Sequence, residues 1–399
     1  MKKLAFILSL LCFSNLFAAA TTDDRTQLPG IFQNSYVGVD LAYLDFAYSN
    51  ADLNAGYSAG QIKNNLIGAS VYAGHYFNPY LALQLSYMRP GPWVKFTNVT
   101  NNAGATPETA TVWLNYLMLT LRPTLPINDR WSVYGEVGPA YVSRYGFTMS
   151  NGANIPSVGL IVPDTGVGAS YRFSGQWHLE FSADSIWGNA ANKQPATYYG
   201  EVGAYYLFNP EQAMETGSGS PYIFPLNTIE IGLYNRSVFN WDPTTFFTSV
   251  VPIFWNGEVL TQSGDYLMYE RNVYHTQRWF SLDWGVDGAR WESLYDHDVY
   301  YTASIFPEVR FWLLQQPKVA LYFNYSAAGP TYLSRSTIDG QATGGHFTFQ
   351  DFLGFGSYFG AERNFNINLK IIHYSSGNLM PNHNPGIKVP VMLGLGYAF

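Results

Sequence analysis

The chain has 399 residues and a formal net charge of −7, with 17% aromatic and only 12% charged residues, so it does not have the composition of an ordinary soluble domain. The net negative charge and the scattered lysines and arginines argue against a nucleic-acid partner. The mean hydropathy of −0.07, without apolar runs of about twenty residues after the N-terminus, argues against a helical membrane protein.

The N-terminus has the pattern of a secretory signal. Two lysines precede an apolar run over residues 4–17, and an Ala-x-Ala cleavage site ends at Ala20. The apolar run is too short to span a bilayer as a permanent helix. We therefore predict that residues 1–20 are a signal peptide and that residues 21–33 are an N-terminal tail. Cys12 is the only cysteine, so we expect neither a disulfide nor a thiol nucleophile in the mature chain.

Eight segments before residue 209 alternate between apolar residues and small or polar ones. In the first of them, Val37, Val39 and Leu41 alternate with Gly38 and Asp40. The segments cover 36–43, 63–77, 79–90, 111–125, 131–145, 158–173, 178–187 and 199–208. An alternation with period two is typical of strands, and a strand of a transmembrane barrel is apolar on one face only. We therefore predict an antiparallel transmembrane β-barrel over residues 34–208.

Acidic residues recur in the polar rows of these strands, namely Asp40, Glu136, Glu180, Asp184 and Glu201. A barrel of eight strands leaves little room for a channel. We therefore expect a polar interior that is plugged by paired charges. The sequence does not indicate what this first barrel does.

The alternation stops over residues 209–221, a polar stretch with several turn formers that we interpret as a linker. An even number of strands leaves both ends of a barrel on the periplasmic side, where turns are usually short. A connection of this length therefore favours two separate barrels over one large barrel. The predicted fold class is all-β, with two eight-stranded transmembrane barrels in tandem and the second over residues 222–399.

The alternation resumes at residue 229 and is clearest in four further segments, at 308–313, 319–325, 365–375 and 389–399. The region of about residues 240–300 is rich in Trp, Tyr and Asp, and we expect long extracellular loops there as well as strands. A last strand that ends in Phe399 resembles the signal by which the barrel assembly machinery recognises outer-membrane proteins. We therefore predict the outer membrane of a diderm bacterium as the location.

Residues with catalytic potential lie at the end of segment 365–375. Its odd positions carry apolar side chains up to Ile371, and its even positions carry polar ones up to Lys370. The odd row should face lipid and the even row the barrel interior. His373 and Ser375 continue the odd row near one rim. An imidazole beside a hydroxyl is the minimal pair for acyl transfer, and a nucleophile that faces the bilayer would meet a lipid acyl ester.

This region resembles the lipid A 3-O-deacylase family of outer-membrane barrels. The resemblance covers residues 222–399, and its specific part is His373-Tyr374-Ser375, then Pro381-Asn382 and Gly386-Ile387, before a last apolar strand that ends in an aromatic residue. It implies that His373 is the general base and Ser375 the nucleophile. It also implies that lipid A in lipopolysaccharide is the substrate and that no cofactor is needed. The first barrel resembles, more loosely, the small OmpA-type barrels.

Two positions differ from the family pattern. The family usually has Asn directly after the nucleophile, and this chain has Ser376. Backbone donors of Gly377 and Asn378, or the side chain of Asn378, can take over the binding of the oxyanion.

The second difference concerns the acidic residue that orients the imidazole in the family. This chain has Lys388 after the Gly-Ile step, which cannot accept the hydrogen bond of a histidine N–H. Asn384 can orient a neutral imidazole through its amide oxygen, as an asparagine does in outer-membrane phospholipase A. Asn382 and Glu362 are alternatives.

Two functions therefore remain open. The first is hydrolysis of the 3-O-linked acyl chain of lipid A by His373 and Ser375. The second is a non-catalytic barrel for envelope structure, adhesion or solute passage, in which the pair is inherited but idle. Asp296-His297-Asp298 offers ligands for a cation, but we favour a solvated loop for these residues and assign no metal site.

Overall fold

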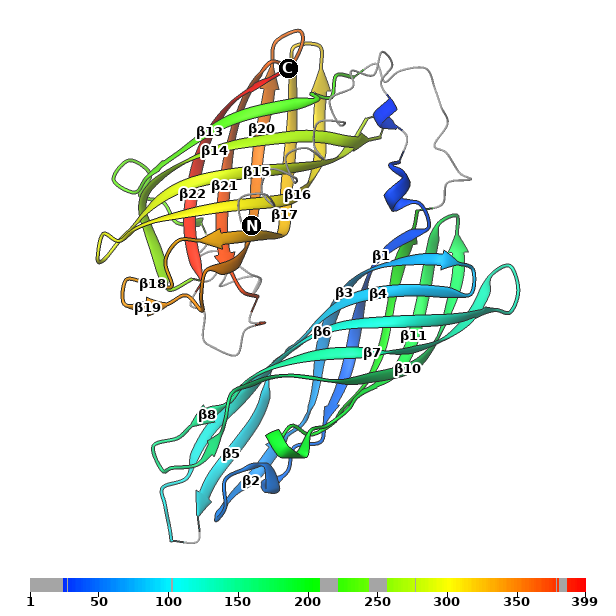
Figure 1. The fold of residues 1–399 in the computed structure, drawn as a ribbon, viewed down its shortest axis with the longest axis vertical. Helices are drawn as coiled ribbons and strands as arrows, with labels where there is room; N and C mark the ends of the chain where they lie inside the picture. The colour runs from blue at the N-terminus through cyan, green and yellow to red at the C-terminus, as the bar shows by residue number, and fades with distance from the viewer. Residues whose placement is uncertain are drawn as a thin grey trace, which may run out of the picture.

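The computed structural model describes residues 24–26, 28–101, 103–208, 222–243, 257–276, 278–377, 379 and 386–399. It contains two antiparallel β-barrels, each closed by eight strands (Figure 1). The predicted fold class is therefore confirmed. The predicted signal peptide and the linker over residues 209–221 lie outside the described residues. Within the described part of the chain, no helix is long and apolar enough to cross a membrane.

The first barrel has one strand for each of the eight alternating segments. Its strands are β1 (Ser35–Phe46), β3 (Asn65–Asn78), β4 (Leu81–Gly91), β6 (Glu108–Pro126), β7 (Trp131–Tyr145), β10 (Val158–Ser174), β11 (Trp177–Ile186) and β12 (Thr197–Leu207). The pairings of β1 with β12 and of β6 with β7 complete the ring. Along β1 the alternation has the predicted sense, since Leu41 is 63% exposed and its neighbour Asp40 only 5%.

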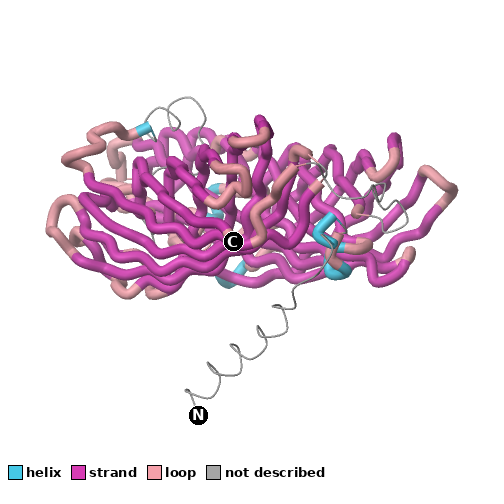
Figure 2. Tube along the Cα trace, turned by 90° about the horizontal axis from the view of Figure 1, so that it is seen from above, coloured by secondary structure: helices cyan, strands magenta, loops and turns pink. Residues whose placement is uncertain are grey.

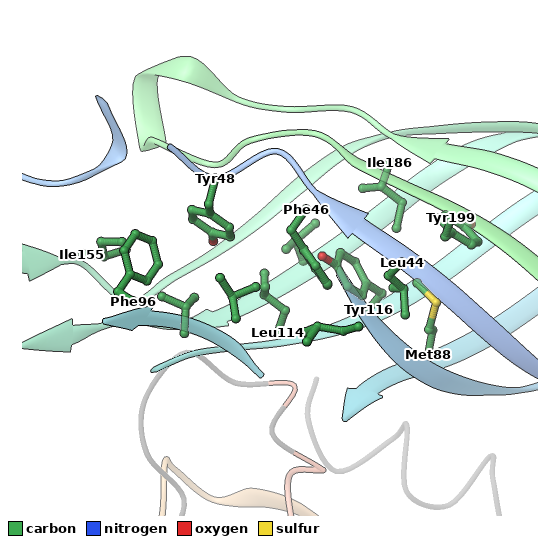
Figure 3. Close-up of a cluster of buried hydrophobic side chains, with 14 of the residues drawn as sticks. Leu44, Phe46, Tyr48, Met88, Phe96, Leu114, Tyr116, Ile155, Ile186 and Tyr199 are labelled. Carbon is green, nitrogen blue, oxygen red and sulfur yellow. The ribbon is translucent and has the colours of Figure 1, made fainter. Parts of the chain in front are cut away.

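Two clusters of side chains fill the interior of the first barrel. Arg122 is buried and pairs with Glu136 at 3.2 Å and with Glu180 at 2.8 Å, so the predicted charge pairing is present. Nearer the end of the barrel at which β1 terminates, apolar side chains that include Phe46, Phe96 and Tyr116 form a core (Figure 3). Four strands that the alternation did not predict extend the barrel at this end: β2 (Tyr57–Lys63), β5 (Val94–Asn101), β8 (Phe147–Thr148) and β9 (Asn154–Ile155).

The second barrel consists of β13 (Asn227–Asn235), β14 (Val259–His275), β15 (Phe280–Ser293), β16 (Val299–Gln316), β17 (Val319–Leu333), β20 (Phe347–Phe359), β21 (Phe365–Ser375) and β22 (Ile387–Ala398). The pairing of β13 with β22, from Thr228 opposite Ala398 onward, closes the ring. Phe399 follows β22, and its main chain exchanges hydrogen bonds with Asn227. Its recognition by the assembly machinery stays a prediction.

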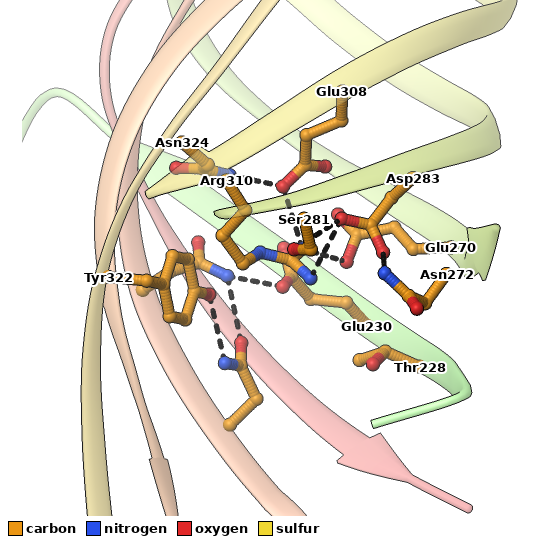
Figure 4. Close-up of polar contacts among 12 residues, drawn as sticks. Thr228, Glu230, Glu270, Asn272, Ser281, Asp283, Glu308, Arg310, Tyr322 and Asn324 are labelled. Carbon is orange, nitrogen blue, oxygen red and sulfur yellow. Dashed lines mark hydrogen bonds and ion pairs between the residues drawn. The ribbon is translucent and has the colours of Figure 1, made fainter. Parts of the chain in front are cut away.

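A network of charged side chains fills the middle of the second barrel (Figure 4). Arg310 pairs with Glu308 at 2.6 Å, with Glu270 at 2.9 Å and with Asp283 at 3.4 Å. Lys370 of β21 is fully buried and pairs with Glu230 and Glu270 at 3.0 and 3.2 Å. The even positions of β21 therefore face the interior, as predicted. This fixes the outward direction of its odd positions.

Loop lengths give the orientation of both barrels. Short turns join β14 to β15, β16 to β17 and β20 to β21 at the end where the chain terminates. Longer connections lie at the other end, including the hairpin of β18 (Thr337–Ile338) and β19 (Gln341–Ala342). Outer-membrane barrels have short periplasmic turns and long extracellular loops. The extracellular end is therefore the end of β18 and β19 in the second barrel (left in Figure 1) and the end of β2, β5 and β8 in the first (lower left in Figure 1).

The second barrel contacts the N-terminal tail at the periplasmic end and the first barrel at the extracellular end, and Figure 2 shows the two barrels next to each other. At the periplasmic end, Arg25 donates hydrogen bonds to Asn272 Oδ1 and to the carbonyl oxygen of Phe224, both at 3.2 Å. At the extracellular end, the Tyr87 hydroxyl of β4 donates to the carbonyl oxygen of Gly377, 3.0 Å away.

Candidate functional site

His373 and Ser375 lie at the extracellular end of β21, on its outer face. Between them, Tyr374 is buried in the interior, where its hydroxyl lies 3.3 Å from Thr302 Oγ1. Because successive side chains of a strand point to opposite faces, His373 and Ser375 point outward together. Their Cα atoms are about 7 Å apart, a separation that an imidazole and a hydroxymethyl group can bridge. His373 is nevertheless only 3% exposed, so its imidazole lies in a covered site on the wall.

Asp351 orients the imidazole of His373. It stands directly opposite His373 in the pairing of β20 with β21, and its Oδ1 lies 3.0 Å from His373 Nδ1. The side chains are well covered, with 14% of Asp351 and 4% of His373 exposed. A carboxylate at Nδ1 fixes the tautomer and the ring orientation. The sequence reasoning did not find this residue, although the turn at 360–364 would have given the register of the hairpin.

Lys388 flanks His373 on the other side, in the pairing of β21 with β22. Its Nζ lies 2.9 Å from Asp242 Oδ2, so the charge of the lysine is compensated by a carboxylate of its own. The register of β21 against β22 shifts at a β-bulge between Lys370 and Ile372, just before His373 pairs with Lys388. The position at which the resemblance implies an acid is thus a paired lysine, and the acid beside His373 comes from β20.

Gly377 brings a backbone donor to the hydroxyl of Ser375. The chain leaves β21 and turns at Gly377 with φ = +61°, a left-handed conformation that glycine adopts readily. The turn directs the Gly377 N–H to Ser375 Oγ at 3.3 Å. An N–H next to the nucleophile can donate to an oxyanion that forms on a carbonyl attacked by Oγ. The role of Gly377 in binding an oxyanion stays a prediction.

The other predicted positions are not near the pair or lie outside the described residues. Asn378, Asn382 and Asn384 lie outside them, so their proposed roles stay predictions. Glu362 lies in the exposed turn between β20 and β21, at the periplasmic end of the strand that carries His373 at its extracellular end. It cannot orient His373, because the length of β21 separates the two residues.

Asp296, His297 and Asp298 form part of the loop between β15 and β16. The carboxylates of Asp296, Asp298 and Asp339 offer oxygens within 4.8 Å of one another. His297 does not join them, because its Nδ1 contacts Glu292 at 2.9 Å, and Arg335 pairs with Asp298. The loop therefore already neutralises part of its own charge.

Two family models match the chain. The model described as outer membrane protein beta-barrel domain matches residues 7–213, just over half of the chain. The chain belongs to the outer-membrane β-barrel proteins. The model of the lipid A 3-O-deacylase family, PagL, matches residues 266–398, which include β15 to β22 and therefore the His373 site. The predicted resemblance and the location in the outer membrane of a Gram-negative bacterium are thus confirmed.

Several solved structures of outer-membrane proteins are similar to part of the chain. Ail, the attachment invasion locus protein of Yersinia pestis, is 14% identical and covers 44% of this chain and 99% of its own, with a TM-score of 0.28. The outer membrane enzyme PagL is 16% identical over 43% and 99%, with a TM-score of 0.31. OprG from Pseudomonas aeruginosa is 12% identical over 44% and 97%, with a TM-score of 0.32. No curated protein matches the chain.

Proposed function

We propose that the protein is a serine esterase that removes the 3-O-linked acyl chain of lipid A. The match to the deacylase family supports this substrate class. The observation that carries the proposal is the hydrogen bond between Asp351 and His373 on the outer wall. His373 precedes Ser375 by two residues on the same face of β21. A carboxylate, an imidazole and a hydroxyl in this order are the parts of an acyl-transfer site. Their position at the extracellular end matches the leaflet in which lipid A resides.

The proposed reaction has two steps. Asp351 accepts the Nδ1–H of His373, so that Nε2 is the nitrogen that removes the proton of Ser375. Ser375 Oγ attacks the acyl carbonyl, and the Gly377 N–H donates to the oxyanion of the tetrahedral intermediate. The intermediate expels the 3-hydroxyl group of the sugar, which takes the proton from His373.

Water then attacks the acyl-enzyme with the same base. The bond between Ser375 Oγ and the acyl carbon breaks, the hydroxyl regains its proton from His373, and the fatty acid is released. In this scheme His373 takes up and returns each proton, and no cofactor is used.

Mass spectrometry of lipid A from cells that express the protein tests the proposal. Wild-type protein should remove one hydroxyacyl chain, and Ser375→Ala should leave lipid A intact. Ser58→Ala, which changes an exposed serine of β2, is the matched control and should behave as wild type. Intact lipid A in cells with correctly assembled wild-type barrels would refute the proposal and favour a non-catalytic role in the envelope. Release of fatty acid from purified phospholipid instead would change the substrate.

A further inference from the structure

The outward side chains of the first barrel change from apolar to polar and aromatic near Ser375. The outward row of β4 is apolar at Leu83 and Leu85 and then continues with Tyr87 and Arg89. On β6, the outward leucines at 117, 119 and 121 give way to Asn115 and Trp113 toward the extracellular end. β21 changes in the same way, from Ile371 to His373. Three strands of two barrels thus become polar on their outer faces where the barrels contact each other.

Hydrogen bonds connect this polar wall to the nucleophile. The Tyr87 hydroxyl lies 3.0 Å from the carbonyl oxygen of Gly377 and 3.3 Å from Asn115 Oδ1, so one proton is shared between two acceptors. The N–H of the same Gly377 donates to Ser375 Oγ. Asn115 is only 2% exposed although it points outward, which shows that the wall is covered at this point.

We propose that the first barrel is the second wall of the active site. Tyr87 acts as a positioning residue that holds Gly377 against Ser375, and Arg89 binds a phosphate of the lipid A headgroup. This inference rests on the proposed function and gives the first barrel a part in it.

The spacing along β4 supports the role of Arg89. It lies two residues beyond Tyr87 toward the extracellular end, and two residues of a strand span about 7 Å. The phosphorylated sugars of lipid A lie on that side of its acyl esters. A guanidinium binds phosphate through two parallel hydrogen bonds, which makes arginine the most suitable residue for this contact. Trp93 and Trp113, stacked at 3.9 Å near the same rim, add an aromatic surface typical of the membrane interface.

Kinetics of the purified full-length protein on two substrates test the proposal. The substrates are bisphosphorylated lipid A and the same lipid A without phosphates. Arg89→Gln should raise KM about tenfold for the phosphorylated substrate and much less for the dephosphorylated substrate. Tyr87→Phe should lower kcat about tenfold on both substrates and leave KM within about twofold, because it removes the hydroxyl that holds Gly377 in position. A contact that merely joins the barrels would not produce this division between KM and kcat.

Lys95→Gln is the matched control, since it removes an exposed positive charge from β5 of the same barrel. It should leave both substrates unaffected. Equal losses on the two substrates in Arg89→Gln, or wild-type kinetics in both Arg89→Gln and Tyr87→Phe, would overturn the proposal.

A binding measurement separates this proposal from the esterase reaction. Fluorescent bisphosphorylated lipid A should bind the Ser375→Ala protein, and Arg89→Gln in that background should weaken binding about tenfold. If the wild type removes no acyl chain but this difference is present, the esterase proposal fails and the headgroup site remains. If the wild type is active and Arg89→Gln changes neither binding nor KM, the headgroup site is wrong and the esterase remains.

Discussion

His373 and Lys388 face each other across β21 and β22, and each is held by a different aspartate. Asp351 of β20 contacts the imidazole at 3.0 Å, and Asp242 contacts the ammonium group at 2.9 Å. The lysine occupies the position at which the family resemblance implies an acid. The carboxylate that contacts the histidine, that of Asp351, therefore comes from the strand on the opposite side.

Asp351→Asn should lower kcat by about 10² to 10⁴ and change KM little. The amide can present its N–H₂ group to Nδ1 and so stabilise the wrong tautomer of His373. The rate of acyl release from lipid A by purified protein measures the effect. Asp265→Asn, which neutralises an exposed aspartate on β14, is the control and should keep wild-type rates. Wild-type kcat in Asp351→Asn would show that this carboxylate has no catalytic role.

Placing a carboxylate on β22 instead of β20 should restore part of the kcat that Asp351→Asn loses. In the Asp351→Asn background, Lys388→Glu with Asp242→Asn places a carboxylate opposite His373 without a neighbouring like charge. Side chains directly opposite in an antiparallel pair have Cβ atoms about 5 Å apart, within reach of the ring. We expect kcat about tenfold above that of Asp351→Asn alone. Lys388→Gln with Asp242→Asn in the same background controls for the loss of the lysine, and equal rates in the two triple variants would contradict the idea.

Arg310→Leu should destabilise the second barrel by about 3–5 kcal/mol, because it leaves Glu308, Glu270 and Asp283 buried with one cation fewer. Urea unfolding in lipid vesicles, followed by tryptophan fluorescence, measures the free energy of unfolding. Arg290→Leu replaces an exposed arginine of β15 and should change it by less than about 0.5 kcal/mol. Similar effects of the two substitutions would mean that the buried network contributes little.

Glu108 should make the extracellular extension of the first barrel sensitive to acid. Its carboxylate accepts hydrogen bonds from the Ser150 hydroxyl at 2.6 Å and the Asn151 N–H at 2.7 Å, and these lower its pKa from the ordinary value of 4.5. Because folding lowers the pKa of Glu108, the carboxylate contributes its full stabilisation of the folded extension above pH 4.5. This stabilisation is lost as the pH falls through the lowered pKa.

Hydrogen exchange of the loop around Asn151 is the measurement for this prediction. At neutral pH, Glu108→Gln should increase its exchange, whereas Asp45→Asn, at an exposed position of β1, should not. After correction for intrinsic rates, the wild type should approach Glu108→Gln only at acidic pH. A pH-independent difference between the two proteins would argue against the carboxylate.

Strand alternation predicted all eight strands of the first barrel and five of the second, because lipid outside and packed side chains inside impose opposite demands on successive residues. It missed β14, β15 and β20, and the first two of these lie in a region for which we expected long loops as well as strands. The same parity gave the outward direction of His373 and Ser375. It could not give Asp351, since contacts between strands depend on the register that the turn at 360–364 sets. Nor could it give β2 and β5, which lie beyond the apolar band, where neither face of a strand meets lipid. The contact of Tyr87 with Gly377 could not be predicted either, because alternation within one barrel carries no information about how two barrels pack against each other.

The charged network around Arg310 has a consequence for the fatty acid that the proposed reaction would release. With its middle occupied by Arg310, Lys370 and their carboxylates, the second barrel offers no path along its axis for a long hydrocarbon chain. A detached fatty acid would have to drift sideways into the surrounding leaflet. Its disposal would then fall to whichever proteins extract free fatty acids from the cell surface.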